Sequence, residues 1–366
     1  MVKNILFNPL SPKKIAKLLF LFLSVFFLFH TVVWFLFTKQ ILDTPLDTRV
    51  GDLARLSYQL DSMQLRETSK LTLPQQHIEA KDWKEGPVDI ITIGDSFSNG
   101  GAGGINPYYQ DYLASTYHLK VLNLAPSKMD KNPIETIISL YNNGLLDVLK
   151  PRFILLSSVE RETLKRFAVN ISYDYNISQA QSLYNFKHPI VNAHKQKGIS
   201  IINNGNYKVL INPLIYKFSN KPIALSGIYK MPLKRALFTA KVPDTLLFHQ
   251  DDIKGIGYAT EKNLQQLNHN LNTLARVLKE KNIRLIFMPA VDKYTLYAPY
   301  LRNNPFPQSH FFEDLNVLKK EYIFINTKQI LSKLLPDQKD LYYADDTHWN
   351  FMASKTVVQS IKSMMQ

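Results

Sequence analysis

A serine followed by several glycines stands just after a short apolar run. The stretch IITIGDSFSNGGAGG covers residues 90–104 and places Ser96 three residues after Ile93. Continuous apolar runs of this kind are typical of strands buried on both faces of a parallel sheet. Ligands of open α/β sheets bind beyond the carboxyl ends of such strands, where a serine can serve as a nucleophile.

Other interpretations of this loop fit less well. A phosphate-binding P-loop requires Gly-Lys-Ser/Thr at a fixed distance from its first glycine, and none follows Gly94. The glycines lack the GxGxxG spacing of a dinucleotide site, and the α/β-hydrolase pattern GxSxG fails because position 98 is serine. A plain turn at the end of a strand remains the alternative.

A nucleophilic serine needs a base, and the base needs an orienting group. The stretch YYADDTHWN, residues 342–350, has Asp346 and His348 two positions apart. This spacing allows the carboxylate to hold one ring nitrogen while the other faces Ser96. A loop with a helix N-cap and a metal site of Asp345, Asp346 and His348 are the alternatives. No second ligand cluster accompanies them, so we predict neither a metal nor another cofactor.

The N-terminus has the features of a membrane anchor. Residues 18–37 contain no formal charge and are interrupted only by Ser24, His30 and Thr31. About 20 apolar residues cross a hydrocarbon core. Four lysines precede this run, at positions 3, 13, 14 and 17, so the positive-inside rule places residues 1–17 in the cytoplasm. We expect a single-pass helix over 18–38 in the inner membrane and a periplasmic C-terminal domain, with a cleavable signal peptide as the alternative.

The composition of the chain limits the kinds of site and of binding partner that it can have. The 366 residues include no cysteine, which excludes disulfides and thiolate metal sites. The formal net charge of +14 suits an anionic lipid, glycan or nucleic acid, or an ordinary solvated basic surface. No nucleic-acid-binding module is recognisable, so no nucleic-acid partner is expected.

Apolar runs and helical patterns alternate from residue 87 onward. Strands are expected at 88–93, 119–124, 153–159, 285–288 and 322–326. Helical spacing marks 134–145 after Pro133, 264–278 after Thr260, and the residues after Asn350. The sequence therefore predicts a doubly wound, mainly parallel α/β domain over 87–366, joined to the anchor by a tether with a short helix over 39–86.

An insertion over 168–258 interrupts this alternation and is rich in Asn and Tyr. We expect it to be either a sugar-binding platform or an inert insertion. A platform would use the aromatic rings of Tyr173, Tyr175, Tyr184 and Tyr207.

Two motifs together resemble a known family. GDSF (94–97) and DTHWN (346–350) resemble the SGNH/GDSL hydrolase superfamily, in the branch of the alginate O-acetylation proteins AlgJ and AlgX. YYQDYLA (108–114), Glu160-Arg161 and PAVDKYTLY (289–297) are similar to further segments of that branch. The resemblance covers about residues 86–366 apart from the insertion.

The resemblance implies roles for individual residues. Ser96 is the expected nucleophile, His348 the general base and then acid, and Asp346 the orienting carboxylate. The usual oxyanion glycine and asparagine are replaced by Ala125-Pro126 and Glu160-Arg161. Arg161 is therefore a candidate for oxyanion or substrate binding, with a structural ion pair as the alternative. Lys293 and Tyr297 are candidates for lining an acceptor cleft, with ordinary loop residues as the alternative.

The resemblance also implies a reaction. We expect a membrane-anchored O-acyltransferase, foremost an O-acetyltransferase, that modifies a cell-envelope polysaccharide through an acyl-serine. A membrane-bound O-acyltransferase partner would supply the acetyl groups. An SGNH-type esterase or deacetylase and a non-catalytic glycan-binding assembly protein remain alternatives.

Overall fold

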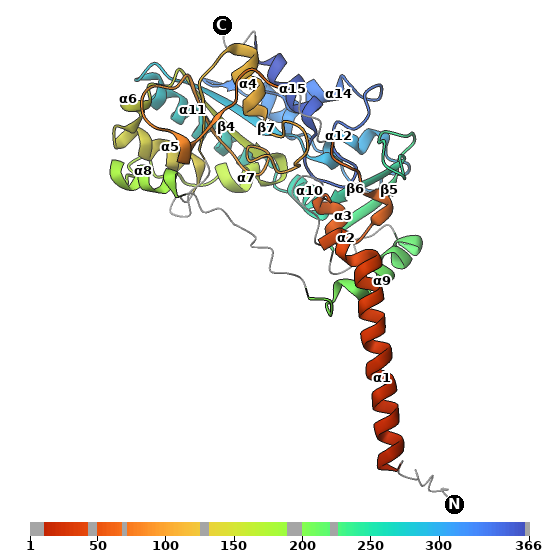
Figure 1. The fold of residues 1–366 in the computed structure, drawn as a ribbon. Coiled ribbons are helices and arrows are strands. Elements are labelled where there is room, and N and C mark those ends of the chain that lie inside the picture. Colours follow the sequence, from red (N-terminus) through yellow and green to blue (C-terminus); the bar gives the residue numbers. More distant parts are fainter. Residues whose placement is uncertain are drawn as a thin grey trace, which may run out of the picture.

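The computed structural model describes residues 11–42, 50–67, 72–124, 132–188, 200–219 and 226–362. It consists of an α/β domain from which one long N-terminal helix, α1, projects (Figure 1). The candidate site lies in the α/β domain, and α1 points away from it.

A six-stranded sheet forms the centre of the domain, with all neighbouring strands parallel and in the order β1-β3-β2-β4-β7-β8. Ile93, the last residue of β2, pairs with Leu124 on β3 and with Leu156 on β4. The carboxyl ends of these central strands therefore meet at one edge. The strands are β1 (Ile78–Glu79), β2 (Ile90–Ile93), β3 (Val121–Leu124), β4 (Phe153–Val159), β7 (Arg284–Ala290) and β8 (Ile323–Phe324).

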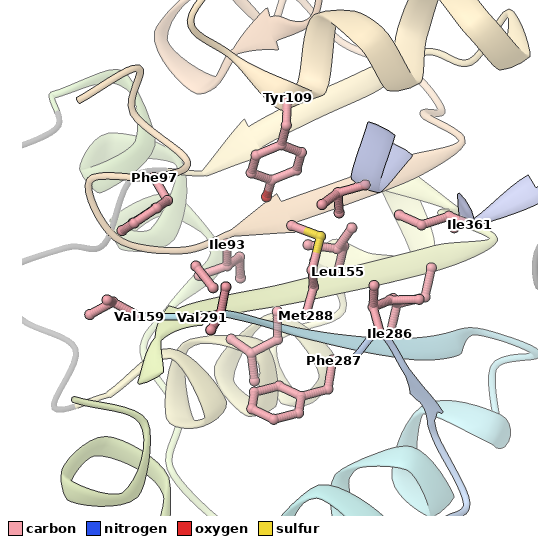
Figure 2. Packing of buried hydrophobic residues seen from close by; sticks show 14 of the residues in the cluster. Ile93, Phe97, Tyr109, Leu155, Val159, Ile286, Phe287, Met288, Val291 and Ile361 are labelled. Atoms are coloured by element: carbon pink, nitrogen blue, oxygen red, sulfur yellow. The ribbon is translucent and has the colours of Figure 1, made fainter. Parts of the chain in front are cut away.

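Helices cover both faces of this sheet, so its central strands are completely buried. Helix α15 contacts α4 and α14, and on the other side α11 contacts α5, α7 and α13. Figure 2 shows the core formed between these layers, where Ile93, Leu155 and Met288 pack together. Burying a side chain of this size stabilises the fold by about 1.5–3 kcal/mol. These observations confirm the predicted parallel α/β architecture.

The helix ends follow from local sequence signals. Thr260 caps α11 by accepting a hydrogen bond from the Asn263 backbone N–H, and Asn350 caps α15 in the same way. Asn132 caps α5, in which Pro133 takes the first position. The helices of the domain are α4 (Tyr109–Tyr117), α5 (Pro133–Asn142), α6 (Leu145–Leu149), α7 (Glu160–Phe167), α11 (Glu261–Lys279), α12 (Lys293–Tyr297), α13 (Phe311–Val317), α14 (Thr327–Ser332) and α15 (Phe351–Ser360).

The predicted insertion is structured in its described parts. An antiparallel hairpin pairs β5 (Ile228–Pro232) with β6 (Thr245–His249). This hairpin contacts the short helix α3 (Asp52–Ser57), which lies within the range predicted as a tether. The other helices of the insertion are α8 (Gln179–Lys187), α9 (Gly205–Phe218) and α10 (Gln250–Ile256).

The N-terminal helix is apolar from Leu18 onward, after three lysines in its first two turns. Helix α1 (Pro12–Val33) continues through a π-helical turn (Trp34–Thr38) into α2 (Lys39–Leu42). Residues 12–38 are long and apolar enough to cross a bilayer, and most of them are exposed. A signal sequence meets the same criteria of length and composition.

One ion-pair cluster at the edge of the sheet links β1 to α4. The Nδ1 atom of His77 lies 2.6 Å from an Asp111 oxygen, and its Nε2 atom lies 2.9 Å from an oxygen of Glu79. Burial alone would lower the pKa of His77, but these two carboxylates raise it to about 9. The protonated imidazole therefore contributes to stability.

This contribution depends on pH in a predictable direction. Because the folded pKa of His77 exceeds the unfolded value of about 6.5, the stabilisation is complete below pH 6.5 and is lost as pH rises towards 9. We expect the free energy of unfolding, measured with urea, to fall over this range and His77→Gln to flatten the fall. His269→Gln, on the exposed side of α11, is the control. An unchanged slope in His77→Gln would contradict the assignment.

Candidate active site

The loop after β2 places Ser96 at the carboxyl edge of the sheet. Its turn is held by two backbone hydrogen bonds to the Ser96 carbonyl, from Asn99 (3.2 Å) and Gly101 (2.9 Å). Gly94 allows the chain to leave the strand, because a Cβ there would lie 2.0 Å from the Ser98 hydroxyl oxygen. The Ser98 hydroxyl is itself buried against the Tyr109 hydroxyl, 3.1 Å away. The two serines of GDSFS thus have different surroundings.

Ser96, His348 and Asp346 form one line of hydrogen bonds. The Ser96 Oγ lies 2.7 Å from His348 Nε2, and His348 Nδ1 lies 2.6 Å from an Asp346 carboxylate oxygen. The same oxygen accepts a hydrogen bond from the His348 backbone N–H at 3.0 Å. The structure therefore brings together the three residues predicted from the two motifs. This geometry allows the imidazole to accept the serine proton while the carboxylate fixes its tautomer.

Close packing fixes the position of the imidazole. The Phe97 ring lies against it, with centroids 4.8 Å apart. On another side, a Cβ at Gly101 would lie 2.5 Å from His348 Nε2 and 2.8 Å from the Ser96 carbonyl. Only glycine at position 101 leaves room for the histidine at its present distance from Ser96.

The charges around His348 favour its protonated form. Burial alone would lower the pKa of His348, but the Asp346 carboxylate and its hydrogen bond offset this and raise it above its usual value. Burial would raise the pKa of Asp346, whereas His348 and Arg66 hold it well below its usual range. Asp346 therefore stays ionised and stabilises the imidazolium that forms when His348 takes a proton.

Arg66 is a component of the site that the sequence did not indicate. One guanidinium nitrogen donates to Asp346 at 2.9 Å and another donates to Asp345 at 2.7 Å. A third donates to the Ala102 carbonyl in the serine loop at 3.1 Å, and the guanidinium lies 4.0 Å from the centre of the Tyr343 ring. Arg66 thus ties the acidic loop to the serine loop. An isolated arginine in a polar segment carries no periodicity or motif that predicts this role.

Further contacts attach the segment 50–67 to the same loop. The backbone N–H groups of Gly51 and Gln64 donate to the second Asp345 oxygen, at 3.0 and 3.2 Å. Asp52, at the start of α3, accepts hydrogen bonds from the Thr347 backbone and hydroxyl, at 2.8 and 2.5 Å. The segment that follows the apolar helix is therefore part of the active site.

Lys293 and Tyr297 lie beneath the loop and do not line an open cleft. Both are fully buried. The Lys293 ammonium donates to the carbonyls of Tyr343 (2.8 Å), Ala344 (2.8 Å) and Asp346 (3.0 Å). Burial lowers the pKa of Lys293 to about 8. We expected these two side chains to contact an acceptor. Both are instead buried, and Lys293 holds the acidic loop in place by donating hydrogen bonds to the carbonyl groups of that loop.

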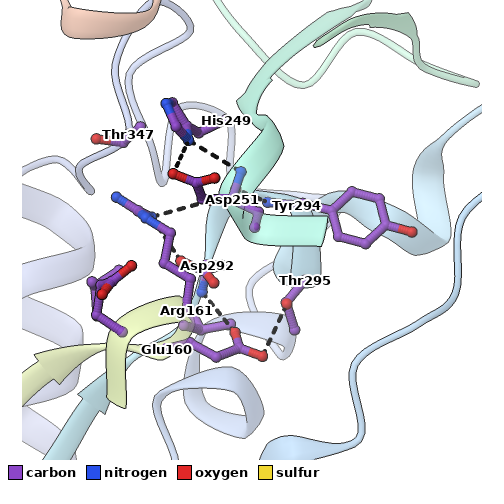
Figure 3. Close-up of polar contacts among 12 residues, drawn as sticks. Glu160, Arg161, His249, Asp251, Asp292, Tyr294, Thr295 and Thr347 are labelled. Carbon is purple, nitrogen blue, oxygen red and sulfur yellow. Dashed lines mark hydrogen bonds and ion pairs between the residues drawn. The ribbon is translucent and has the colours of Figure 1, made fainter. Parts of the chain in front are cut away.

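Arg161 is held by a buried acidic cluster. Its guanidinium donates to Asp292 at 2.8 Å and to Asp252 at 3.2 Å (Figure 3). The neighbouring Glu160 accepts from the Asp292 backbone N–H and from the Thr295 hydroxyl. These contacts agree with the alternative interpretation, in which Arg161 forms a structural ion pair. The Arg161 charge also lowers the pKa of His348. Its role towards an oxyanion stays a prediction, and Ala125-Pro126 lie outside the described residues.

The tyrosines expected to form a sugar platform are dispersed. The Tyr173 hydroxyl donates to a carbonyl of α11 at 3.1 Å, and Tyr184 stacks on His188. Tyr207 packs against Phe29 in α1. These three tyrosines therefore pack against different parts of the structure, and the platform interpretation of the insertion stays a prediction.

Three side chains of the site also satisfy the spacing of a metal site. One donor atom each from Asp52, Asp346 and His348 lie within 4.8 Å of one another. All three side chains already have hydrogen-bond partners, namely Thr347 for Asp52 and each other for Asp346 and His348. These hydrogen bonds account for the close approach of the three donor atoms.

The raised pKa of His348 predicts a pH dependence. A serine-directed fluorophosphonate requires neutral His348, so we expect the labelling rate at Ser96 to rise with pH and to reach half its maximum above pH 6.5. Ser96→Ala should abolish labelling, and Ser98→Ala, which changes a hydroxyl facing Tyr109, should retain it. Equal labelling of Ser96→Ala would refute the assignment.

Arg66 allows a second test. Arg66→Gln leaves two buried carboxylates without their counter-charge, so we expect it to cost about 3–5 kcal/mol of unfolding free energy. The uncompensated negative charge should also raise the pKa of His348 and move the labelling midpoint to higher pH. Arg66→Lys should keep the midpoint, and Arg276→Gln, exposed on α11, should change neither quantity. A midpoint that stays fixed in folded Arg66→Gln would show that the role of Arg66 is only structural.

Comparison with known families supports the same assignment. Residues 243–366 match the family model of the SGNH hydrolase-like domain of the acetyltransferase AlgX. No curated protein and no solved structure matches the chain significantly. The matched segment contains Asp346 and His348, whereas Ser96 and Arg66 precede it. Residues 243–366 are thus similar to the SGNH hydrolase-like domain of the acetyltransferase AlgX, which confirms the resemblance suggested by the two motifs.

Proposed function

We propose that this chain is a membrane-anchored O-acetyltransferase that modifies a cell-envelope polysaccharide. The observation that carries the proposal is the hydrogen-bonded line Ser96–His348–Asp346 in a chain whose C-terminal segment matches an acetyltransferase family. The apolar helix serves as an inner-membrane anchor, with residues 1–17 in the cytoplasm and the domain in the periplasm. A membrane-bound O-acyltransferase partner supplies the acetyl groups.

The reaction proceeds in two steps. The Ser96 oxygen attacks the carbonyl of an acetyl donor while His348 takes the serine proton, and the donor leaves with a proton from His348. This gives an acetyl-serine. A sugar hydroxyl then loses its proton to His348 and attacks the acetyl carbonyl, and Ser96 regains its proton. Asp346 stabilises the imidazolium in both steps. The Ser96 backbone N–H, with Arg161 as a candidate second donor, would stabilise the oxyanion.

Two clefts border the serine loop, and Ser96 and His348 themselves line neither of them. One, of about 550 Å³, is lined by Gly94, Asp95 and residues of α5 and α7. In it, buried oxygens of Glu135 and Ser157 have no hydrogen-bond partner among the described residues. The other, of about 1060 Å³, is lined by residues 99–100 and 103–108 of the loop together with Trp83 and Lys84. Such surfaces suit a ligand rich in hydroxyl groups.

The position of the site favours a substrate delivered at the membrane. Only eight residues separate Leu42, the last residue of α2, from Gly51, whose backbone N–H donates to Asp345. Eight residues span at most roughly 30 Å. The catalytic loop therefore lies near the membrane surface, where an acetyl group passed across the bilayer emerges.

Transfer and hydrolysis can be separated with the full-length protein. Given 4-nitrophenyl acetate alone, we expect slow hydrolysis, because water is not held beside the acetyl-serine as a bound sugar hydroxyl would be. Oligosaccharides of the native envelope polysaccharide should accelerate nitrophenol release and appear as acetylated products by mass spectrometry. Ser96→Ala should abolish both, and Ser98→Ala should retain both.

Each alternative function gives a different result. Fast hydrolysis without acetylated sugar would identify an esterase. A folded protein that binds the oligosaccharide but never acquires an acetyl group at Ser96 would be a non-catalytic assembly protein. Either result would overturn the proposed transferase.

A further inference from the structure

Helix α9 has one side that is buried in the protein and an opposite, apolar side that is exposed. The buried side faces α1 and α3 and consists of Gly205, Asn206, Val209, Asn212 and Tyr216. We call the opposite side the outer face of α9. It consists of Tyr207, Leu210, Ile211, Leu214, Ile215 and Phe218, which are 37–85% exposed. A helix that exposes this many large apolar side chains on one side is typical of membrane or protein contact.

Specific contacts attach α9 to the apolar helix α1. The Tyr207 hydroxyl lies 3.1 Å from His30 Nε2, and the Asn206 amide nitrogen lies 2.7 Å from His30 Nδ1. The Tyr207 ring stacks on Phe29, with centroids 5.2 Å apart. A polar side chain within a membrane span needs partners, and α9 supplies both for His30. The buried imidazole therefore fixes where α9 crosses α1.

The level of this crossing lies inside the apolar span. His30 precedes Thr38, the last residue of the candidate span, by eight residues. At 1.5 Å per residue this is about 12 Å along the helix axis, and a hydrocarbon core is about 30 Å thick. If α1 spans the bilayer, α9 begins below the level at which that core ends.

An apolar groove separates the two helices on the lipid side. It has a volume of about 340 Å³. It is lined by Phe22, Val25, Phe26 and Phe29 of α1 and by Tyr207, Leu210 and Ile211 of α9. One wall of the groove is thus the face that α1 would present to lipid. Figure 1 shows α9 crossing α1 near its junction with the domain.

We propose that the outer face of α9 is immersed in the domain-side leaflet of the bilayer that α1 spans, and that the groove holds a lipid acyl chain. This rests on the membrane anchorage in the proposed function. Lipid that covers α1 extends into the groove without any additional partner. Lys217, exposed near the C-terminal end of α9, and Lys39, just after the apolar span, suit the anionic headgroup layer above it. The helix thereby fixes the height of the domain above the membrane.

The absence of cysteine from the chain makes the test direct. Single-cysteine variants of the full chain, Ile211→Cys and Leu214→Cys, are labelled with bimane in phosphatidylcholine–phosphatidylglycerol vesicles whose acyl chains carry a nitroxide quencher. Phe22→Cys in α1 is the positive control. Val317→Cys in α13, at an apolar residue that is 82% exposed, is the matched control. Fluorophosphonate labelling of Ser96 reports the folding of each variant.

We expect quenching at positions 211 and 214 to be at least about threefold stronger than at 317 and comparable to that at 22. Strong quenching at 22 with weak quenching at 211 and 214 would overturn the proposal and leave the anchorage intact. Weak quenching at 22 would refute the anchorage itself and the proposal with it. Labels at 211 and 214 that are protected from both the lipid nitroxide and aqueous iodide would show a second copy on this face, which also overturns the proposal.

Discussion

Two adjacent carboxylates, Asp345 and Asp346, are buried side by side and depend on one guanidinium. Without Arg66 their charges would repel each other in a medium that screens poorly. Asp52 and Lys293 add a third negative and a second positive charge nearby. Of these groups, the Asp346 and Asp52 carboxylates favour the imidazolium form of His348. The same ion cluster therefore holds the loop and prepares the base for proton transfer.

This cluster also explains why segments that are far apart in the sequence lie side by side in the fold. The serine loop follows β2 at the centre of the sheet, whereas the acidic loop comes just before α15 near the C-terminus. The segment 50–67 lies across both and contributes Gly51, Asp52 and Arg66. The segment that follows the apolar helix thus has a dual function, as a connection to that helix and as a wall of the candidate active site.

Sequence patterns predicted the structural features that depend on residues close together in the chain. The buried strands, the caps at Thr260 and Asn350, and the proximity of Asp346 to His348 all arise from residues close in sequence. Arg66 was not predictable, because its partners lie 279 and 280 positions away. Lys293 was expected to line a cleft because of the family resemblance, but it is buried, and three backbone carbonyls compensate for its burial. The insertion appeared polar in composition, yet α9 exposes a set of large apolar side chains on one side.

A site built from both ends of the chain has a consequence for biosynthesis. Ser96 and Arg66 emerge from the ribosome early, but their partners His348 and Asp346 lie 252 and 280 positions later. Contacts of such separation form late, because the intervening chain must first be ordered. Until Asp346 and His348 have been made, the serine lacks its base and the arginine its carboxylates. The nascent protein is therefore unreactive at Ser96 until the ribosome has passed these residues.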